Sequence, residues 1–243
     1  MTDFLEATPE VATLNQYWYS PRTIGAIVSE LESGACGLRV AFLSTPSVYF
    51  SLPEASAVRR ASYCFDLDEQ WASEARFRRF DFNDERVDDD LAGTFDCCVV
   101  DPPFITRDVW ARYATCVRSA LKAEGGRVLL TTVGENEAML RTVLGQSLGA
   151  GLRKTRFMPA MHRAALPYQY SLYVNYDLAA ASALAAWNDE VPDEFRESNA
   201  ARMPDEDAAA AAAAGEAPVA GTSLTFEELL ERELRREGGG GPP

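Results

Sequence analysis

Short apolar runs alternate with apolar stripes of helical spacing along the chain up to about residue 177. The runs predict strands at 38–43, 62–65, 76–80, 95–100 and 127–132. The stripes predict helices, one of which is capped by Ser20 with Pro21 at its first position. Members of the three stripes are Ile24, Ile27, Val28 and Leu31; Trp110, Tyr113, Ala114, Val117 and Leu121; and Met139, Leu140, Val143 and Leu144. Strands that alternate with helices predict an α/β fold with a mostly parallel sheet.

Two further strands, at about 152–158 and 168–176, follow each other with no helix between them. They predict an antiparallel hairpin at the edge of the sheet. Apolar and polar residues alternate in the second of these strands, which predicts that it is half-exposed.

The composition changes at both ends of this pattern. Residues 1–13 are expected to form a flexible leader, and 14–178 to form one domain. From Ala179 the chain is rich in acidic residues, Gly and Pro, with an alanine run at 208–214 and few large apolar side chains. Residues 179–243 are therefore expected to be a mostly disordered, dispensable tail. A capping box at Thr225–Glu228 predicts one short helix near 224–236.

The net charge of −14 argues against binding along a phosphate backbone and favours a basic protein partner. The five cysteines show no C-x-x-C spacing, so neither a disulfide framework nor a metal site is expected. Cys97 and Cys98 are adjacent in a strand and should point to opposite core faces. The N-terminus does not resemble a signal peptide, and no segment is suited to cross a membrane, so we expect a cytoplasmic monomer.

The candidate chemistry centres on Asp101-Pro102-Pro103-Phe104, which lies between the strand at 95–100 and a helix. The carboxylate of Asp101 and the Pro102 carbonyl can accept hydrogen bonds from one amine, while the prolines fix the turn and donate none. Phe104 would add a flat apolar wall. Ligands of α/β proteins bind at the carboxyl ends of strands, so this turn predicts an amine-methylating site. The alternative is a plain strand-to-helix corner.

Cofactor contacts are predicted at the ends of the preceding strands. The turn Ser44-Thr45-Pro46-Ser47 follows the first strand and has no G-x-G, although its small residues allow close backbone approach. Asp66 or Asp68 is placed to accept from ribose hydroxyls, the alternative being a solvated loop. Asp81 is placed to accept from an adenine amine while Phe80 or Phe82 packs on the ring.

Three further residues are candidates for the substrate pocket. Trp18 and Tyr19 either pack the helix from Pro21 against the sheet or line a pocket mouth. His162 is the single histidine of the chain, and it lies between the last two strands, near the expected substrate mouth.

Six segments together resemble the eukaryotic lysine methyltransferases of translation elongation factor 1-alpha, a family first labelled as N6-adenine DNA methyltransferases. They are 15–20, 44–49, 66–68, Asp81-Phe82-Asn83, Asp101-Pro102-Pro103-Phe104 and 173–177. The resemblance covers about Leu14 to Asp177. Family members have Asn-Glu-aromatic where this chain has Tyr168-Gln169-Tyr170.

The resemblance implies a class I, S-adenosylmethionine-dependent methyltransferase fold. It implies that Ser44 to Ser47 lie near the methionine end of the cofactor, that Asp66 or Asp68 holds the ribose, and that Asp81 with Asn83 holds the adenine. Asp101 to Phe104 would hold the target amine.

The sequence thus predicts a protein-lysine N-methyltransferase with elongation factor 1-alpha as substrate. Two alternatives stay open: a nucleic-acid adenine N6-methyltransferase, which the same turn would serve, and a non-catalytic binding module that kept the fold.

Overall fold

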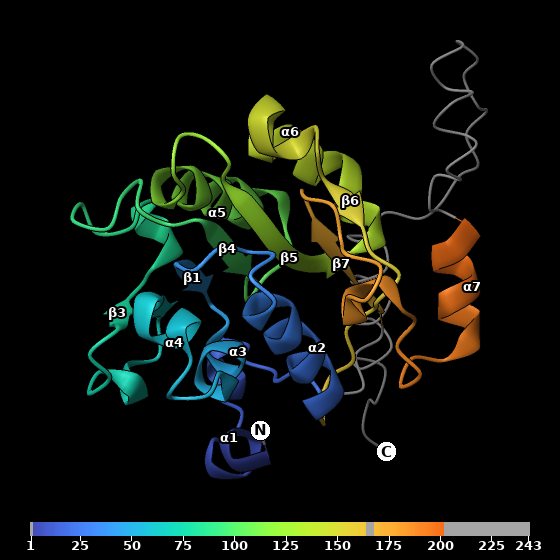
Figure 1. Ribbon diagram of the computed structural model, residues 1–243, viewed down its shortest axis with the longest axis horizontal. Helices are drawn as coiled ribbons and strands as arrows, with labels where there is room; N and C mark the ends of the chain where they lie inside the picture. The colour runs from blue at the N-terminus through green and yellow to red at the C-terminus, as the bar shows by residue number, and fades with distance from the viewer. Residues whose placement is uncertain (1, 164–167, 202–243) are drawn as a thin grey trace, which may run out of the picture. The chain divides into compact units, whose positions relative to one another are not determined.

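A computed structural model of the chain describes residues 2–163 and 168–201 (Figure 1). The helix expected near 224–236 lies outside these residues. Seven strands form one sheet within the unit Met1–Ala200, in the order β3-β2-β1-β4-β5-β7-β6. Their bounds are β1 Val40–Leu43, β2 Tyr63–Asp66, β3 Phe77–Arg79, β4 Cys97–Val100, β5 Arg127–Val133, β6 Arg153–Lys154 and β7 Tyr170–Val174.

The predicted mostly parallel sheet with an antiparallel final hairpin is confirmed. Strands β1 to β5 pair in parallel, and β7 pairs antiparallel with both β5 and β6. Strand β6 is shorter than the predicted 152–158. The Phe157 N–H bonds to the Leu184 carbonyl, so the chain has left β7 by that residue.

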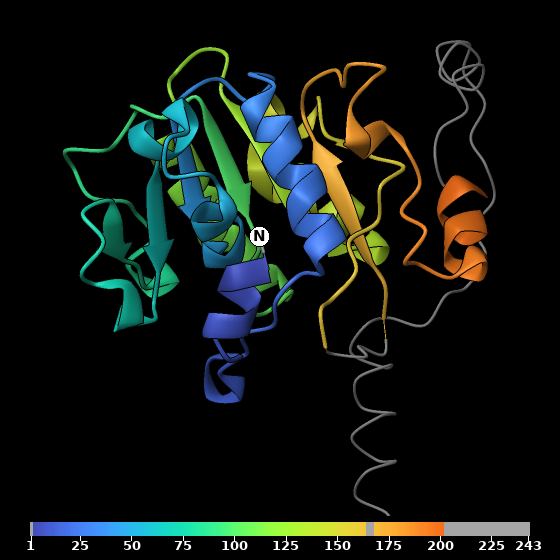
Figure 2. The same cartoon turned by 60° about the horizontal axis from the view of Figure 1, so that its bottom comes forward.

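Helices cover both faces of the sheet. Figure 1 shows α5 (Arg107–Ala120) and α6 (Glu137–Gly149) on one face, and α2 (Pro21–Glu32) and α3 (Pro46–Ser51) on the other; Figure 2 shows the same layers turned. The remaining helices are α1 Thr2–Ala7, α4 Ala57–Ala61, α7 Asp193–Ala201 and the 3-10 turns η1 Ala12–Leu14, η2 Glu69–Trp71, η3 Phe82–Asp84, η4 Gly134–Asn136 and η5 Ala183–Ala185. Ser20 caps α2 as predicted, accepting a hydrogen bond from the Thr23 N–H at 3.1 Å.

Two hydrophobic cores form, one on each face of the sheet. Cys97 belongs to the core under α2 and Cys98 to the core under α5, as their alternation predicted. The prediction that the last strand is half-exposed was wrong. Leu172 and Val174 of β7 enter the first core while Tyr173 enters the second, because β7 lies between two strands and under helices on both faces.

Residues 2–14 pack against the domain, unlike the flexible leader expected from sequence. Leu5 of α1 is buried, and the ring of Phe4 contacts that of Trp18 with centroids 5.4 Å apart. The Trp18 indole N–H donates to the Thr8 carbonyl at 2.8 Å. The two apolar residues Phe4 and Leu5 thus hold this short segment against the aromatic cluster around Trp18.

The segment 179–201 is also ordered, in contrast to the predicted tail. Leu184 in η5 and Val191 are buried, and the amide of Asn188 donates to the Met158 carbonyl at 3.0 Å. Ser182 donates to Glu30 of α2 at 2.5 Å. The prediction of disorder rested on the overall composition of residues 179–243. The contacts of this segment are made by a few separate residues, which overall composition does not reveal.

No helix within the described residues is long and apolar enough to span a lipid bilayer.

Candidate functional site

A cavity opens at the carboxyl ends of β1, β2 and β4, where the strand order reverses between β1 and β4. Parallel sheets place ligands at this position, because helix connections diverge there to opposite faces. Four parts of the chain line it: Leu14–Trp18, the turns after β1 and β2 with Phe80–Phe82, the Asp101-Pro102-Pro103 turn with Tyr113, and Met161 with Tyr168 and Tyr170.

Asp101 presents its carboxyl group to this cavity. Its backbone N–H donates to the Leu43 carbonyl of β1 at 3.2 Å, and its Oδ1 accepts a hydrogen bond from Thr131 Oγ1 at 2.7 Å. Burial raises the pKa of Asp101 to about 6, although the hydrogen bonds from Tyr19 and Thr131 lower it. The carboxyl group is therefore largely ionised at neutral pH and can accept a proton or a hydrogen bond.

The turn after Asp101 is fixed from two sides. The Asn15 side chain donates to the Pro103 carbonyl, and the Asn136 side chain donates to the Ile105 carbonyl at 2.8 Å. Pro102 and Pro103 line the cavity with Asp101. Phe104 does not. Its side chain is 52% exposed outside the cavity, because the chain turns outward before α5.

The turn after β1 contacts helix α5. Ser44 has a left-handed backbone with φ of 55°, and its hydroxyl is 2.6 Å from the hydroxyl of Tyr113. A non-glycine residue in this conformation is strained and is often found at binding sites. Ser44 and Pro46 line the cavity, whereas Thr45 and Ser47 are buried beside it.

The two acidic candidates after β2 differ in position. Asp66 ends β2, lines the cavity and is buried, and burial raises its pKa to about 7. Asp68 is not among the lining residues. Its Oδ1 accepts the Gln70 N–H at 3.0 Å, and its Oδ2 accepts the Gln16 side chain at 3.2 Å. The geometry therefore favours Asp66 as the cavity acceptor.

Asp81 and an aromatic group close another side of the cavity. The rings of Phe80 and Phe82 each lie 5.7 Å from that of Tyr113. Asp81 lines the cavity, and its Oδ1 accepts both from the backbone N–H of Asn83 at 2.9 Å and from its side chain at 2.8 Å. Asn83 is exposed and acts on Asp81 instead of lining the cavity.

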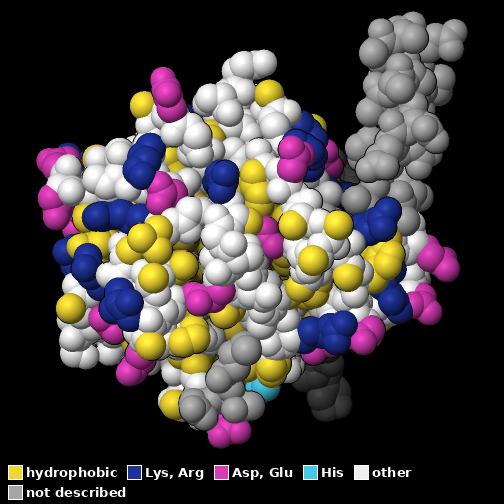
Figure 3. Space-filling view, viewed as in Figure 1, with side chains coloured by type: hydrophobic (Ala, Val, Ile, Leu, Met, Phe, Trp, Pro, Cys, Tyr) yellow, Lys and Arg dark blue, Asp and Glu magenta, His cyan; other side chains and the backbone are white. Residues whose placement is uncertain are grey.

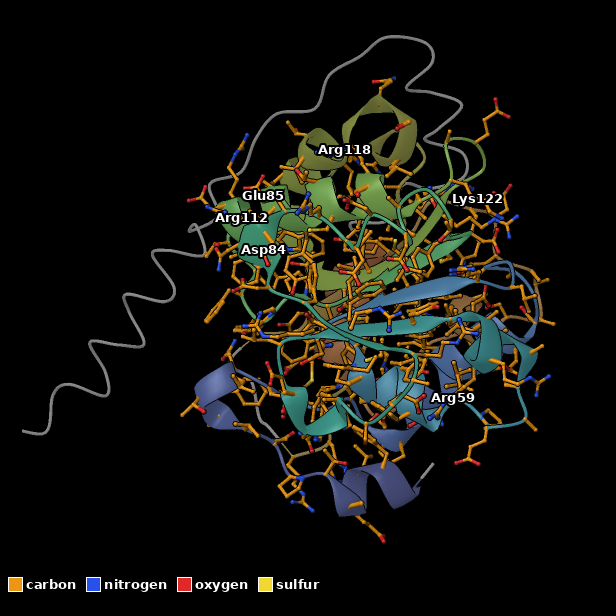
Figure 4. The ribbon with its side chains drawn as sticks, turned by 90° about the vertical axis from the view of Figure 1, so that its left-hand side faces the viewer. Arg59, Asp84, Glu85, Arg112, Arg118 and Lys122 are labelled. Atoms are coloured by element: carbon orange, nitrogen blue, oxygen red, sulfur yellow. The ribbon has the colours of Figure 1, made fainter. Side chains whose placement is uncertain are left out.

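The turn that carries Asp81 is tied to α5 by an ion pair. Figure 4 shows Arg112 of α5 beside Glu85 and Asp84, and the Arg112–Glu85 distance is 3.1 Å. Together with the contact between Phe82 and Tyr113, this pair fixes the far end of the cavity relative to α5.

The three residues predicted for the substrate pocket have different positions. Trp18 is a lining residue, but its side chain is buried and its ring packs in the aromatic cluster with Phe4. Tyr19 lies behind Asp101, with its hydroxyl 2.6 Å from Thr131 Oγ1. His162 is not a lining residue; its backbone N–H bonds to the Trp18 carbonyl, and Met161 beside it reaches the cavity.

The tyrosines that do line the cavity were not selected from sequence. They are Tyr17, Tyr113, Tyr168 and Tyr170, and the last two contact each other with ring centroids 5.6 Å apart. Tyr168 and Tyr170 share the parity of one strand face, so the alternation that predicted the strand also indicated that their rings point the same way. Burial raises the pKa of both, which keeps them neutral phenols.

The chemistry of the cavity fits S-adenosylmethionine, the cofactor that the resemblance implies. The buried carboxyl group of Asp66 can accept from a ribose diol, and Asp81 beside Phe82 can accept from the amine of a flat adenine ring. Carboxylates also favour a sulfonium cation nearby. The residues present therefore suit the group.

The chain is similar in sequence to known methyltransferases. The family model described as "Probable N6-adenine methyltransferase" matches residues 10–178. The curated "EEF1A lysine methyltransferase 1" of Danio rerio is 29% identical over 172 residues, which are 68% of this chain and 97% of that protein. "Protein-lysine N-methyltransferase EFM5" of Saccharomyces cerevisiae is 24% identical over 182 residues, which are 69% of this chain and 72% of that protein.

Among solved structures, a TehB-like SAM-dependent methyltransferase from Corynebacterium glutamicum is 15% identical with a TM-score of 0.39, covering 71% of this chain and 91% of that one. The family match spans the whole sheet and every residue of the cavity described above. The chain belongs to the family described as probable N6-adenine methyltransferases and is a class I methyltransferase.

Proposed function

We propose that this chain is an S-adenosylmethionine-dependent protein-lysine N-methyltransferase that acts on elongation factor 1-alpha. The observation that carries the proposal is the carboxyl group of Asp101 in a cavity walled by Tyr17, Tyr168 and Tyr170. The names of the curated relatives, lysine methyltransferases of EEF1A among them, support the choice of substrate.

The chain's own residues supply the cofactor contacts. Asp66 would accept from the ribose hydroxyls, Asp81 from the adenine amine, and Ser44 would lie near the methionine end. S-adenosylmethionine, when bound, supplies an electrophilic methyl group on a sulfonium.

The remaining residues prepare the lysine amine. A lysine ammonium has no free lone pair, so it has to lose a proton before it can attack. Burial among Tyr17, Tyr168 and Tyr170 lowers the pKa of the amine, because a charged ammonium is disfavoured where water is excluded. Asp101 accepts a hydrogen bond from the amine, orients its lone pair and takes up or passes on the proton. The exposed ring of Phe104 beside this turn is available to contact the substrate protein around the lysine.

Adenine methylation is the second candidate, because Asp101 and the turn carbonyls could equally hold an exocyclic amine. The net charge of −14 opposes it. On the face shown in Figure 3, lysine and arginine side chains lie interspersed with acidic ones among the described residues. The described residues on this face thus form no continuous basic stripe of the kind that binds a phosphate backbone.

The direct test is methyl transfer from tritiated S-adenosylmethionine to two acceptors. Purified elongation factor 1-alpha and an adenine-containing oligonucleotide are incubated separately with the full chain. We expect label on the elongation factor, sensitive to protease and resistant to nuclease. Label on the oligonucleotide with an unlabelled elongation factor would refute the lysine assignment and establish the adenine alternative.

Replacing Asp66 by asparagine is expected to weaken cofactor binding while it stabilises the fold. Loss of a charged acceptor for a buried diol should cost about 1.5–3 kcal/mol of binding free energy, measured by calorimetry. The pKa of Asp66 is about 7 in the folded chain and near 3.9 unfolded, so ionising it costs folding free energy as the pH rises between these values. Asparagine stays neutral, so the variant should melt several degrees higher at pH 8, and this gain should vanish towards pH 4.

Asp68→Asn is the matched control, because it removes a carboxylate two residues away that bonds within its own loop and to Gln16. It should leave cofactor affinity within about twofold, as for a surface group. Weakened binding in Asp68→Asn and normal binding in Asp66→Asn would reverse the assignment of the ribose contact.

A further inference from the structure

We propose that Thr131 and Tyr19 are positioning residues for Asp101, which fix its carboxylate by hydrogen bonds from β5 and from the segment before α2 and so present it to the target amine. The inference rests on the proposed methyl transfer, and it assigns Tyr19 to Asp101 instead of to the substrate pocket.

The chain of contacts joins three separate parts of the fold. Thr131 lies on β5 beside β4, where Val100 pairs with Leu130, so its side chain reaches the residue that follows β4. Its Oγ1 is 2.7 Å from Asp101 Oδ1 and 2.6 Å from the Tyr19 hydroxyl. Thr131 is 1% exposed and Tyr19 2%, so water does not compete for either hydroxyl.

The direction of the hydrogen bonds follows from the inventory of donors. An ionised carboxylate only accepts, so the Thr131 hydroxyl donates its single hydrogen to Asp101. The oxygen of Thr131 can then accept from Tyr19. The Tyr19 hydroxyl is also a hydrogen-bond partner of Asp101, so Thr131 and Asp101 compete for its single hydrogen. Burial, and then the charge of Asp101, raise the pKa of Tyr19, so it keeps the proton that it donates.

Two consequences follow for the carboxyl group. Oδ1 is held from the side of β5, which fixes the rotation of the group. The donated hydrogen bonds also favour the charged form of Asp101, against the burial that raises its pKa to about 6. Without them, a buried carboxyl group would hold its proton closer to neutral pH and accept the amine proton less readily.

The pH dependence of the methyl-transfer rate can be used to follow the ionisation of Asp101, and the other titratable groups near it have to be considered first. Burial raises the pKa of each facing tyrosine above 10, namely Tyr19 before α2, Tyr113 of α5, and Tyr168 and Tyr170 at β7. Asp66 shares the cavity and has a pKa of about 7, so rates are taken with saturating cofactor to suppress its effect on binding.

The test compares Thr131→Val, which keeps the shape and removes the hydroxyl, with Thr131→Ser, which keeps the hydroxyl. Methyl transfer is measured as kcat from pH 5 to 9. We expect the acid limb in Thr131→Val to move up by about one pH unit, since the variant loses a hydrogen bond to a charged group. At pH 6.5 its rate should fall about tenfold, and at pH 8.5 much less. Thr131→Ser should restore the wild-type profile.

Tyr19→Phe removes the outer donor and should move the acid limb in the same direction by a smaller amount. The double variant Tyr19→Phe with Thr131→Val should move the acid limb by less than the sum of the two single shifts, because residues in one hydrogen-bond network are not additive. Equal acid limbs in Thr131→Val and the wild type would overturn the proposal, as would a Thr131→Ser profile that matches Thr131→Val.

A second readout does not depend on methyl transfer. The carboxyl carbon of Asp101 is titrated by NMR in the free protein, assigned by its loss in Asp101→Asn. A higher Asp101 pKa in Thr131→Val than in Thr131→Ser supports the positioning chain even if the elongation factor is not the acceptor. An unshifted Asp101 pKa, in protein that still methylates the elongation factor, refutes the chain and leaves the proposed function intact.

Discussion

Replacing Asp101 by alanine is expected to lower the rate of methyl transfer by about 10³-fold, because the variant loses the group that orients the amine and accepts its proton. The fold should persist. The turn is held by Pro102 and Pro103 and by the Asn15 hydrogen bond to the Pro103 carbonyl, none of which needs the carboxylate. Single-turnover rates with labelled S-adenosylmethionine give the effect, and cofactor affinity by calorimetry should stay within a few fold.

The asparagine variant separates the two candidate substrates. A lysine amine must lose a proton, and the neutral amide is a poor base, so Asp101→Asn should be nearly as inactive as alanine on the elongation factor. An adenine amine is already uncharged and needs mainly an acceptor, so on an oligonucleotide the same variant should keep more of its activity. Wild-type activity on the elongation factor should also fall as the pH drops through about 6, where Asp101 takes up a proton. Near-normal lysine methylation by Asp101→Asn would exclude Asp101 as the proton acceptor.

The fold was predictable from sequence where local pattern and tertiary environment agree. The short apolar run at 97–100 is typical of a strand buried on both faces, and the opposite orientation of Cys97 and Cys98 follows from strand geometry. The pattern misled at β7, where polar Ser171 and aromatic Tyr173 alternate with aliphatic residues. Both are buried, because helices cover both sides of that strand.

The centre of the site was also predictable, because it is a local device. A buried strand, an acidic residue and two prolines in succession place Asp101 at the carboxyl end of β4, where parallel sheets bind ligands. The pocket walls depend on how distant segments cross. Tyr17 and Tyr170 are brought to the same cavity although they are far apart in sequence, while Phe104, the last residue of the motif, is left outside. Only the tertiary structure decides between such aromatics.

The choice between Asp66 and Asp68 shows the same limit. Both follow one strand, and sequence gives each the same chemistry. The turn points one carboxyl group into the cavity and directs the other to the N–H of Gln70 and the side chain of Gln16.

Truncation after Leu178 is expected to destabilise the domain severely, whereas truncation after Ala201 is expected to leave it unchanged. Residues 179–201 bury Leu184 and Val191, which together contribute about 3–6 kcal/mol to the free energy of unfolding. Removing them also takes the Ser182 hydrogen bond from Glu30, a carboxyl group buried within α2. For a domain of this size the thermal midpoint should fall by roughly 10–20 °C.

The longer truncated form, ending at Ala201, is the matched control, because the stretch it lacks contains the alanine run and few large apolar residues. Leu184→Ala in the full chain isolates the packing term and should cost about 2–5 kcal/mol. The two truncated forms and Leu184→Ala are each followed by thermal melting and by methyl transfer at a temperature well below the midpoint. Glu190 bonds to Ser20, the cap of α2 next to Tyr19, so loss of 179–201 should also loosen the support of Asp101. A form ending at Leu178 that melts with the control would show that residues 179–201 do not stabilise the core, and the domain would then end at residue 178.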